Sequence, residues 1–217
     1  MTGNLKYLPN TNALEQRAAE LEKENERLKK RNFALERLIA EDELTGLHNR
    51  NGFLNLLARQ YIPQMYRQVI QSITVGLFDM DNLKGINDKF GHYSGDIAIK
   101  AAAQNLQNSF REEDVIARLH GDEFAVAVIN ASDRNILKRF GASRIPAVKI
   151  KFCETPIELT MSGGFAELVV AEPNQKDMRS KKSVYRRTIE AALHNADKAM
   201  YLAKSRGKNQ FCFFREL

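Results

Sequence analysis

The chain has 217 residues, of which 43% are hydrophobic, and this is enough for one globular domain and an additional segment. Its net charge of +6 favours anionic partners, such as nucleotides, nucleic acids or acidic membranes, without choosing among them. No apolar run approaches the roughly eighteen residues that cross a bilayer, and the N-terminus lacks the apolar segment of a signal peptide, so the sequence predicts a cytoplasmic protein without a membrane partner.

Residues 1–40 carry a heptad repeat. Asn25 and Asn32 occupy two of its a positions, and a buried asparagine there favours a parallel, in-register pair of helices. The d positions are all leucine: Leu14, Leu21, Leu28 and Leu35. In a parallel pair, the facing g and e residues have opposite charges: Arg17–Glu22, Glu24–Lys29 and Arg31–Glu36. The repeat therefore favours a dimerising coiled coil over a single amphipathic helix packed on the next domain, which would bury both asparagines without partners.

Residues 41–217 are expected to form a second domain, in which strands and helices interleave. Asn51 and Gly52, both common in turns, are assigned to a turn near its start. Helices are expected at residues 99–110, 133–145 and 188–205. Strands are expected at residues 72–81, 114–119, 122–129, 155–168 and 209–214, the fourth of them interrupted by two glycines. This order predicts an α/β sandwich with a mixed or antiparallel sheet rather than a doubly wound fold.

Carboxylates lie at the ends of two predicted strands. Asp79 and Asp81 end the buried strand, and Asp122 and Glu123 lie at the tip of the hairpin that the next two strands form. Buried like charges are costly unless a cation joins them, and one or two carboxylates with substrate phosphates are typical ligands of Mg²⁺. Two such ions would suit in-line phosphoryl or nucleotidyl transfer. Taken singly, each pair of acids is equally typical of a solvated turn.

A second polar segment, residues 83–96, contains Asn87, His92 and Asp96 among glycines. An asparagine amide and a carboxylate together match the guanine edge, where O6 accepts a hydrogen bond and N1 and N2 donate. Without further context, the same segment is typical of a polar helix followed by a loop.

Five segments, taken in this order, resemble the GGDEF domain of diguanylate cyclases over about residues 41–215. They are DELTGLHNRNGF, FDMDNLKGINDKFGHYSGD, ARLHGDEF, TMSGGFA and ADKAMYLAKSRGKNQ. The chain departs from the family pattern at His48 in place of proline, at Leu83 in place of phenylalanine and at His120 in place of the first signature glycine. The resemblance implies a nucleotidyl-cyclase-like palm domain, with a central, mainly antiparallel sheet flanked by helices, preceded by the coiled-coil helix.

The resemblance implies a metal and catalytic site. The side chain of Asp79 and the backbone carbonyl of Met80 would bind Mg²⁺, or Mn²⁺ in its place, together with Asp122 and Glu123. One of the last two residues, conventionally the first, would take the proton from the 3′-hydroxyl of GTP. His120 would be strained if its position required a positive φ, so we expect it to adjust or slow the site rather than close it.

Substrate contacts are implied as well. Asn87 and Asp96 would read the guanine base, with His92 beside the nucleotide. The phosphates would be held by three lysines: Lys84, Lys204 and Lys208. Lys208 stands where the family often has arginine, so a bidentate fork becomes a single point charge.

The implied reaction joins two GTP molecules into cyclic di-GMP and releases two pyrophosphates. Each domain holds one GTP, so two domains must meet, and a parallel coiled coil in a homodimer would raise the local concentration of the second. Arg111 and Asp114 form an R-x-x-D motif at the spacing of the family's product-inhibition site, where both would contact cyclic di-GMP. Outside this context, the pair is typical of a surface ion pair.

Two alternative functions are set against this one. His120 and Leu83 favour a degenerate domain that binds GTP or cyclic di-GMP without turnover, as a receptor or scaffold. A nucleic-acid-binding zipper protein would need a basic helix just before the coil, but residues 4–13 contain one lysine and no arginine, so no nucleic-acid partner is expected. The basic segment at residues 173–187 is assigned to a solvated loop, with a contact to a partner or nucleic acid as the alternative.

Overall fold

The computed structural model describes residues 11–140, 144–152, 155–170 and 181–217. The chain divides into two compact units, residues 1–39 and residues 40–217. Across the described residues, no helix combines the length and the apolar character that crossing a membrane requires.

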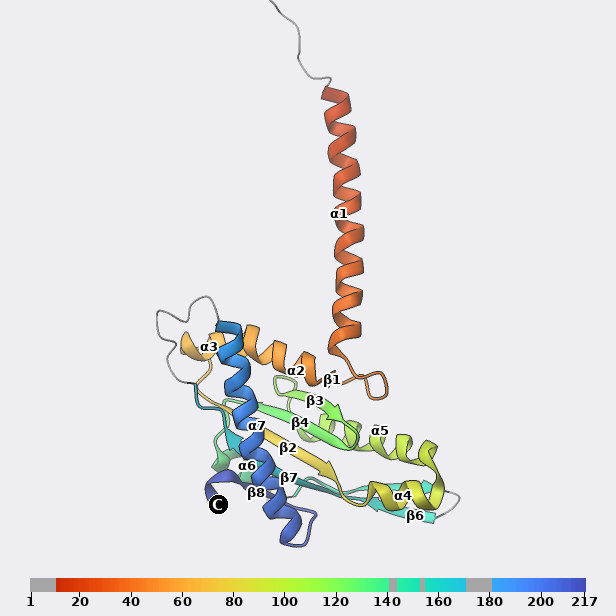
Figure 1. Cartoon of the computed structure of the whole chain (residues 1–217), viewed down its shortest axis with the longest axis vertical. Helices are drawn as coiled ribbons and strands as arrows, with labels where there is room; N and C mark the ends of the chain where they lie inside the picture. Colours follow the sequence, from red (N-terminus) through yellow and green to blue (C-terminus); the bar gives the residue numbers. More distant parts are fainter. Residues whose placement is uncertain (1–10, 141–143, 153–154, 171–180) are drawn as a thin grey trace, which may run out of the picture. The chain divides into compact units, whose positions relative to one another are not determined.

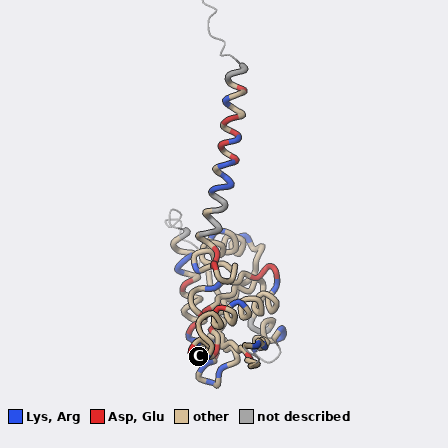
Figure 2. The backbone as a smooth tube through the Cα atoms, turned by 90° about the vertical axis from the view of Figure 1, so that its right-hand side faces the viewer, with Lys and Arg blue, Asp and Glu red and all other residues tan. Residues whose placement is uncertain are grey.

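The first unit contains nearly all of the helix α1, Thr11–Ala40. Both signs of charge occur along it (Figure 2), and exposed ion pairs, which contribute little to stability, join residues three apart: Arg17–Glu20, Glu24–Arg27 and Glu26–Lys29. Ile39, at an a position, is 61% exposed, and the four d-position leucines are about half exposed. A leucine stripe left open along a charged helix is consistent with the expected coiled coil, and its pairing with a second chain stays a prediction.

A six-stranded sheet forms the centre of the second unit (Figure 1). Its strands are β1 His48–Asn49, β2 Ile73–Met80, β3 Val115–His120, β4 Glu123–Ile129, β7 Met161–Glu167 and β8 Phe211–Phe213. Their order across the sheet is β1-β3-β4-β2-β7-β8. The central strand β2 runs antiparallel to β4 and β7, and the parallel pairs lie at the two edges, β1 with β3 and β7 with β8. The mainly antiparallel sheet expected from the sequence is confirmed.

Helices cover both faces of this sheet (Figure 1). One face carries α2 Arg50–Leu56, the π-helix η1 Leu57–Tyr61, α3 Ile62–Tyr66 and α7 Lys181–Ser205. The other carries α4 Leu83–Phe90, α5 His92–Ser109, α6 Asp133–Phe140 and a separate hairpin of β5 Val148–Phe152 and β6 Thr155–Leu159. A short 3-10 helix, η3 Phe214–Glu216, follows β8. The first layer is the core between the sheet and α7, and the second is the core between the sheet and α5. Because side chains alternate along a strand, Val75 and Leu77 of β2 lie in the first layer, and Phe78 and Met80 lie in the second.

The assignment of Asn51 and Gly52 to a turn is wrong, because both lie inside α2. The helix is capped by Asn49, whose side chain accepts a hydrogen bond from the amide of Gly52 at 3.0 Å. A Cβ on Gly52 would lie 2.1 Å from the carbonyl oxygen of Ala40. The turn-like sequence therefore reflects a helix cap and a close approach of two backbones.

The single strand expected over residues 155–168 is in fact two strands, β6 and β7, which belong to different sheets. Gly163 and Gly164 do not interrupt β7. A Cβ on Gly163 would meet the ring of Phe78 at 2.3 Å, and one on Gly164 would meet the backbone of α7. The two glycines therefore allow tight packing on both faces of an intact strand.

The loop assigned to residues 173–187 is wrong in its second part. Residues 181–187 form the first turns of α7. Tyr185, in the middle of this basic stretch, is 7% exposed and belongs to the core of the first layer, so packing outweighs the polar composition. Residues 171–180 lie outside the described residues.

Candidate active site

Three side chains line up across the ends of the neighbouring strands β2, β4 and β3. Asp79 on β2 pairs with Glu123 on β4, and Glu123 pairs in turn with His120 on β3. Directly paired residues of antiparallel strands project from the same face of a sheet. A β-bulge between Arg118 and His120 shifts the register of β3 and brings His120 into this row. The structure thus brings together the acidic strand end and the hairpin tip.

Asp79 is held by a cation. Its carboxylate lies 2.8 Å from Nζ of Lys204, which reaches it from α7. Burial raises the pKa of Asp79, the hydrogen bond and charge of Lys204 oppose this increase, and the charges of Asp122 and Asp81 add to it. A partly buried carboxylate of this kind is stabilised by any further cation that approaches it.

Glu123 is contacted by an imidazole. Nε2 of His120 lies 3.1 Å from Oε2 of Glu123. Burial raises the pKa of Glu123, His120 lowers it, and the carboxylates of Asp79, Asp197 and Asp122 raise it again. The net result is a raised pKa, so this group binds protons and other cations more readily than an exposed glutamate does.

The donor set fits a divalent ion if groups other than side chains complete it. Within the described part of the chain, no three or more histidine, cysteine, aspartate and glutamate side chains are arranged to hold a metal ion by themselves. Asp79 and Glu123 face one another, and the amide of Met80 donates to the carbonyl oxygen of Asp122 at 3.2 Å, which ties the hairpin tip to the end of β2. Two carboxylates completed by a backbone carbonyl and phosphate oxygens are a usual ligand set for Mg²⁺.

The backbone at His120 carries no strain of the kind considered from the sequence. The positive φ of the hairpin tip lies at Gly121, with φ +50°, and His120 is not among the described residues with a positive φ. The second signature glycine therefore supplies the turn, and the substitution at the first position changes the side chain alone.

Two residues that the sequence analysis left without a role hold this hairpin tip. Nε of Arg118 donates to the carbonyl oxygen of Gly121 at 2.9 Å, and its Nη1 pairs with Asp42 at 3.1 Å. Burial by itself would raise the pKa of Asp42, but hydrogen bonds from Thr45 and Arg118 and the charge of Arg118 lower it overall. Both residues lie in the matched segments DELTGLHNRNGF and ARLHGDEF, and this was the only sign of them in the sequence.

Asp81, which the sequence groups with the metal-site acids, has a different role. Its carboxylate accepts hydrogen bonds from the hydroxyls of Thr160 and Ser162, each at 2.7 Å, and from the amide of Asn209 at 3.1 Å. Lys208 and Asn209 form a turn with φ values of 62° and 48°. Asp81 therefore fixes the backbone of the turn that carries an expected phosphate-binding lysine.

The expected phosphate-binding lysines come from two helices and this turn. Lys204, on α7, is 32% exposed in its side chain and is engaged by Asp79. Lys84, near the start of α4, and Lys208 are exposed. A phosphate that reached the site would therefore compete with Asp79 for Lys204 and would meet the other two lysines in their solvated state.

The expected guanine-binding residues lie where α4 meets α5. Oδ1 of Asn87 is buried and has no hydrogen-bond partner among the described residues. A Cβ on Gly95 would lie 1.9 Å from this oxygen, so the glycine makes room for the amide next to Asp96, which is exposed. Gly91, with φ +83°, separates the two helices, and His92 begins the second. An acceptor without a partner, beside a carboxylate, suits the N–H groups of a purine.

Residues 39–210 match the protein family described as diguanylate cyclase, GGDEF domain. The chain belongs to the GGDEF-domain family. The diguanylate cyclase TpbB of Pseudomonas aeruginosa (strain UCBPP-PA14) is 32% identical over 193 residues, which cover 87% of this chain and 40% of that protein. The diguanylate cyclase DgcP of Escherichia coli K12 is 31% identical over 180 residues, which cover 82% of this chain and 48% of that protein. The chain thus spans less than half the length of these relatives.

A solved GGDEF structure agrees with the fold. The coiled coil and GGDEF domain of DgcB from Caulobacter crescentus, in complex with c-di-GMP, has a TM-score of 0.69 and 26% identity, and the match covers 93% of this chain and 99% of that one. The GGDEF fold also explains Leu83, which stands where the family pattern has phenylalanine. Leu83 is 8% exposed and belongs to the core of the second layer, so one apolar core residue replaces another.

The two members of the GGDEF R-x-x-D motif differ in exposure. The side chain of Asp114 is fully buried; it accepts hydrogen bonds from the amides of Arg111 and Ile129 at 2.9 and 3.0 Å and pairs with Nη1 of Arg139 at 3.0 Å. The side chain of Arg111 is 64% exposed and lies 3.5 Å from Glu113. Asp114 therefore joins the start of β3 to β4 and α6, and Arg111 is the member of the pair that is open to a ligand.

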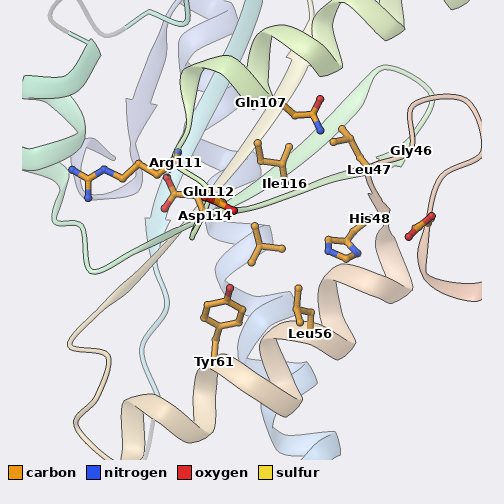
Figure 3. Close-up of a pocket in the computed structure, with 12 residues that line it drawn as sticks. Gly46, Leu47, His48, Leu56, Tyr61, Gln107, Arg111, Glu112, Asp114 and Ile116 are labelled. Carbon is orange, nitrogen blue, oxygen red and sulfur yellow. Dashed lines mark hydrogen bonds between the residues drawn. The ribbon is translucent and has the colours of Figure 1, made fainter. Parts of the chain in front are cut away.

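A cavity of about 540 Å³ lies beside this motif (Figure 3). Its lining includes His48, Tyr61 and Gln107, and Figure 3 shows the guanidinium of Arg111 pointing away from these side chains. Nδ1 of His48 is buried and has no partner among the residues described. The cavity shares no lining residue with the row of Asp79, Glu123 and His120.

Proposed function

We propose that the chain is a diguanylate cyclase, which condenses two GTP molecules into cyclic di-GMP and releases two pyrophosphates. The observation that carries this proposal is the direct pairing of Asp79 with Glu123 across two strands, with Lys204 at 2.8 Å from Asp79. Two neighbouring carboxylates can bind a metal ion, and a lysine beside them can bind a phosphate of the same substrate.

Each residue of the site has a proposed role in metal binding, phosphate binding or proton transfer. Asp79, Glu123 and the carbonyl of Met80 would hold Mg²⁺, with Asp122 beside them, and the bound ion would supply Lewis-acid stabilisation of charge on the phosphates. Lys204 would move from Asp79 to a phosphate oxygen, and Lys84 and Lys208 would bind the remaining phosphates. Asp122 would take the proton from the attacking 3′-hydroxyl as its oxygen bonds to the α-phosphorus and pyrophosphate leaves.

Base recognition would rest on the junction of α4 and α5. Oδ1 of Asn87 is buried without a partner among the described residues, and a guanine N–H would satisfy it. Asp96 would accept the other N–H, and His92 would lie beside the nucleotide. Adenine lacks the N1–H and N2–H₂ donors, so these acceptors favour guanine.

One such site holds one GTP, so the reaction requires two domains facing each other. The open leucine stripe of α1 supports a parallel homodimer as the means of bringing them together. The activity is tested by incubating the purified protein with GTP and Mg²⁺ and measuring cyclic di-GMP and pyrophosphate. If GTP binds and micromolar protein forms no product, the chain is a receptor. Two observations support catalysis over this alternative: Leu83 packs in the core, and His120 is not among the described residues with a positive φ.

We further propose that cyclic di-GMP inhibits the enzyme through Arg111. Arg111→Ala is expected to raise the product concentration for half-inhibition about tenfold or more, because an exposed arginine fork on a phosphate or guanine is lost. Asp114→Asn should instead lower the free energy of unfolding by about 3 kcal/mol, because Arg139 loses its buried partner. Initial rates with added product and thermal unfolding measure the two effects.

The exposed arginine Arg67, on the end of α3, provides a matched control as Arg67→Ala. This variant should leave the inhibition unchanged. Inhibition of Arg111→Ala at the same product concentration as the unaltered chain would remove Arg111 from the feedback site.

A further inference from the structure

The side chain that departs from the family signature lies against a carboxylate of the proposed metal site. We propose that His120 is a ligand of the divalent ion held at Glu123, and that it shifts the preference of this site from Mg²⁺ toward Mn²⁺. The inference rests on the proposed function, because it concerns the ion that the reaction would use. It gives the imidazole a role that a glycine at the same position could not perform.

The distance between the two side chains is that of neighbouring ligands on one ion. Nε2 of His120 and Oε2 of Glu123 are 3.1 Å apart. Side chains with donor atoms about 3 Å apart could both contact one divalent ion. An ion at this point would take the place of the proton between Nε2 of His120 and Oε2 of Glu123, and that proton would leave to solvent.

The surroundings leave access and room for the ion. The side chain of His120 is 66% exposed and that of Glu123 is 28% exposed, so packing does not lock the imidazole in place. A cavity of about 490 Å³ lies beside Glu123, and its lining includes Asp197 and Lys204. The carboxylates of Asp79 and Asp197 both act on Glu123, and a cation beside it would relieve their repulsion.

A nitrogen donor changes which ion such a site prefers. Mg²⁺ takes oxygen donors and retains several waters, whereas imidazole favours first-row transition ions, among which Mn²⁺ is also at home with carboxylates and phosphates. An ion held by Glu123 and phosphate oxygens could equally be Mg²⁺ or Mn²⁺. The addition of His120 therefore strengthens binding of Mn²⁺ selectively.

Pulsed electron paramagnetic resonance of bound Mn²⁺ tests the proposal, because a coordinated imidazole produces a nitrogen hyperfine coupling. The full chain is loaded with Mn²⁺, alone and with a methylene-bridged GTP analogue, and is compared with His120→Gly and His120→Asn. We expect the coupling in the unaltered chain and in neither variant. Affinity for Mn²⁺ should fall about tenfold or more in both variants, and affinity for Mg²⁺ should change less than about twofold.

Two controls separate this inference from the proposed function. His194→Gln removes another exposed imidazole, on α7, and should leave the coupling unchanged. Glu123→Gln should abolish Mn²⁺ binding, and binding that survives it, or an unaltered chain that binds no Mn²⁺, overturns the proposed metal site itself. Binding that depends on Glu123 but shows no nitrogen coupling, or a coupling that survives in His120→Gly, overturns the role of His120 alone.

Discussion

Glu123→Gln is expected to lower the rate of cyclic di-GMP formation by about 10³-fold or more, while the folded protein stays at least as stable as before. Glutamine has nearly the same shape as glutamate but lacks the anionic oxygen that would hold the ion. Stabilisation of transition-state charge by such an ion supplies several kcal/mol, and a loss of about 4 kcal/mol corresponds to this change in rate.

The effect on stability follows from the direction of the pKa change. Burial and nearby carboxylates raise the pKa of Glu123 in the folded protein above its ordinary value of 4.5. The folded state therefore binds a proton more tightly than the unfolded chain does, and the stability of the protein falls as the pH rises from 4.5 through the raised value. At a pH above the raised pKa, the charge of Glu123 lowers the free energy of unfolding. Glutamine carries no charge, so this destabilisation is absent from the variant.

The two effects are measured by initial rates with GTP and Mg²⁺ and by urea unfolding at pH 4 and pH 7. Glu158→Gln, at an exposed position of β6, is the matched control and should change neither quantity. A Glu123→Gln variant with a nearly unchanged rate would refute the assignment of Glu123 to the metal site. A variant that is clearly less stable at pH 7 would contradict the electrostatic account of its environment.

Replacing two leucines of the helix stripe, as Leu21→Ser and Leu28→Ser together, should lower the specific activity roughly 1000-fold at about 1 µM protein. A linked second domain has an effective concentration on the order of 1 mM, and this advantage is lost when the helices separate. The loss should shrink as the protein concentration rises, because two free domains can still meet. Rates over a range of protein concentrations, together with sedimentation, measure the effect.

The matched control changes residues on the other side of the same helix. Lys23→Ser and Lys30→Ser lie at f positions, which a two-stranded coil leaves in water, and they should alter neither the activity nor the oligomeric state. If the leucine variant kept full activity at every concentration, the coiled coil would not be what brings the two domains together.

Local patterns explain which parts of the fold the sequence could predict. The strand at residues 73–80 and the hairpin that carries His120 are apolar runs between turns, and their periodicity needs no distant partner to be recognised. The turn predicted at Asn51 and Gly52 was wrong because it also relied on a local pattern. The start of a helix and a turn contain the same residue types. Residues 155–168 divide between two sheets because β6 pairs with β5 whereas β7 pairs with β2, a strand that lies far away in the sequence.

The candidate site shows the same limit. The metal-site acids could be proposed because their motifs combine residue types that have a known chemistry. The roles of Asp81 and Asp114 could not, because an aspartate bonded to distant hydroxyls, amides or an arginine looks no different in the sequence from one that binds a ligand. His120 was judged by its backbone, whereas its significance lies in a side-chain contact that a β-bulge creates.

The hydrogen bonds of Asp81 also set the order in which the protein can acquire its site during synthesis. Thr160 and Ser162 follow Asp81 by 79 and 81 residues, and Asn209 follows it by 128. On the ribosome, β2 and its acidic end emerge long before the turn at Lys208. A partly synthesised chain therefore has these carboxylates before the turn at Lys208 is fixed, and the proposed nucleotide site is complete only after the segment that contains Asn209 has emerged.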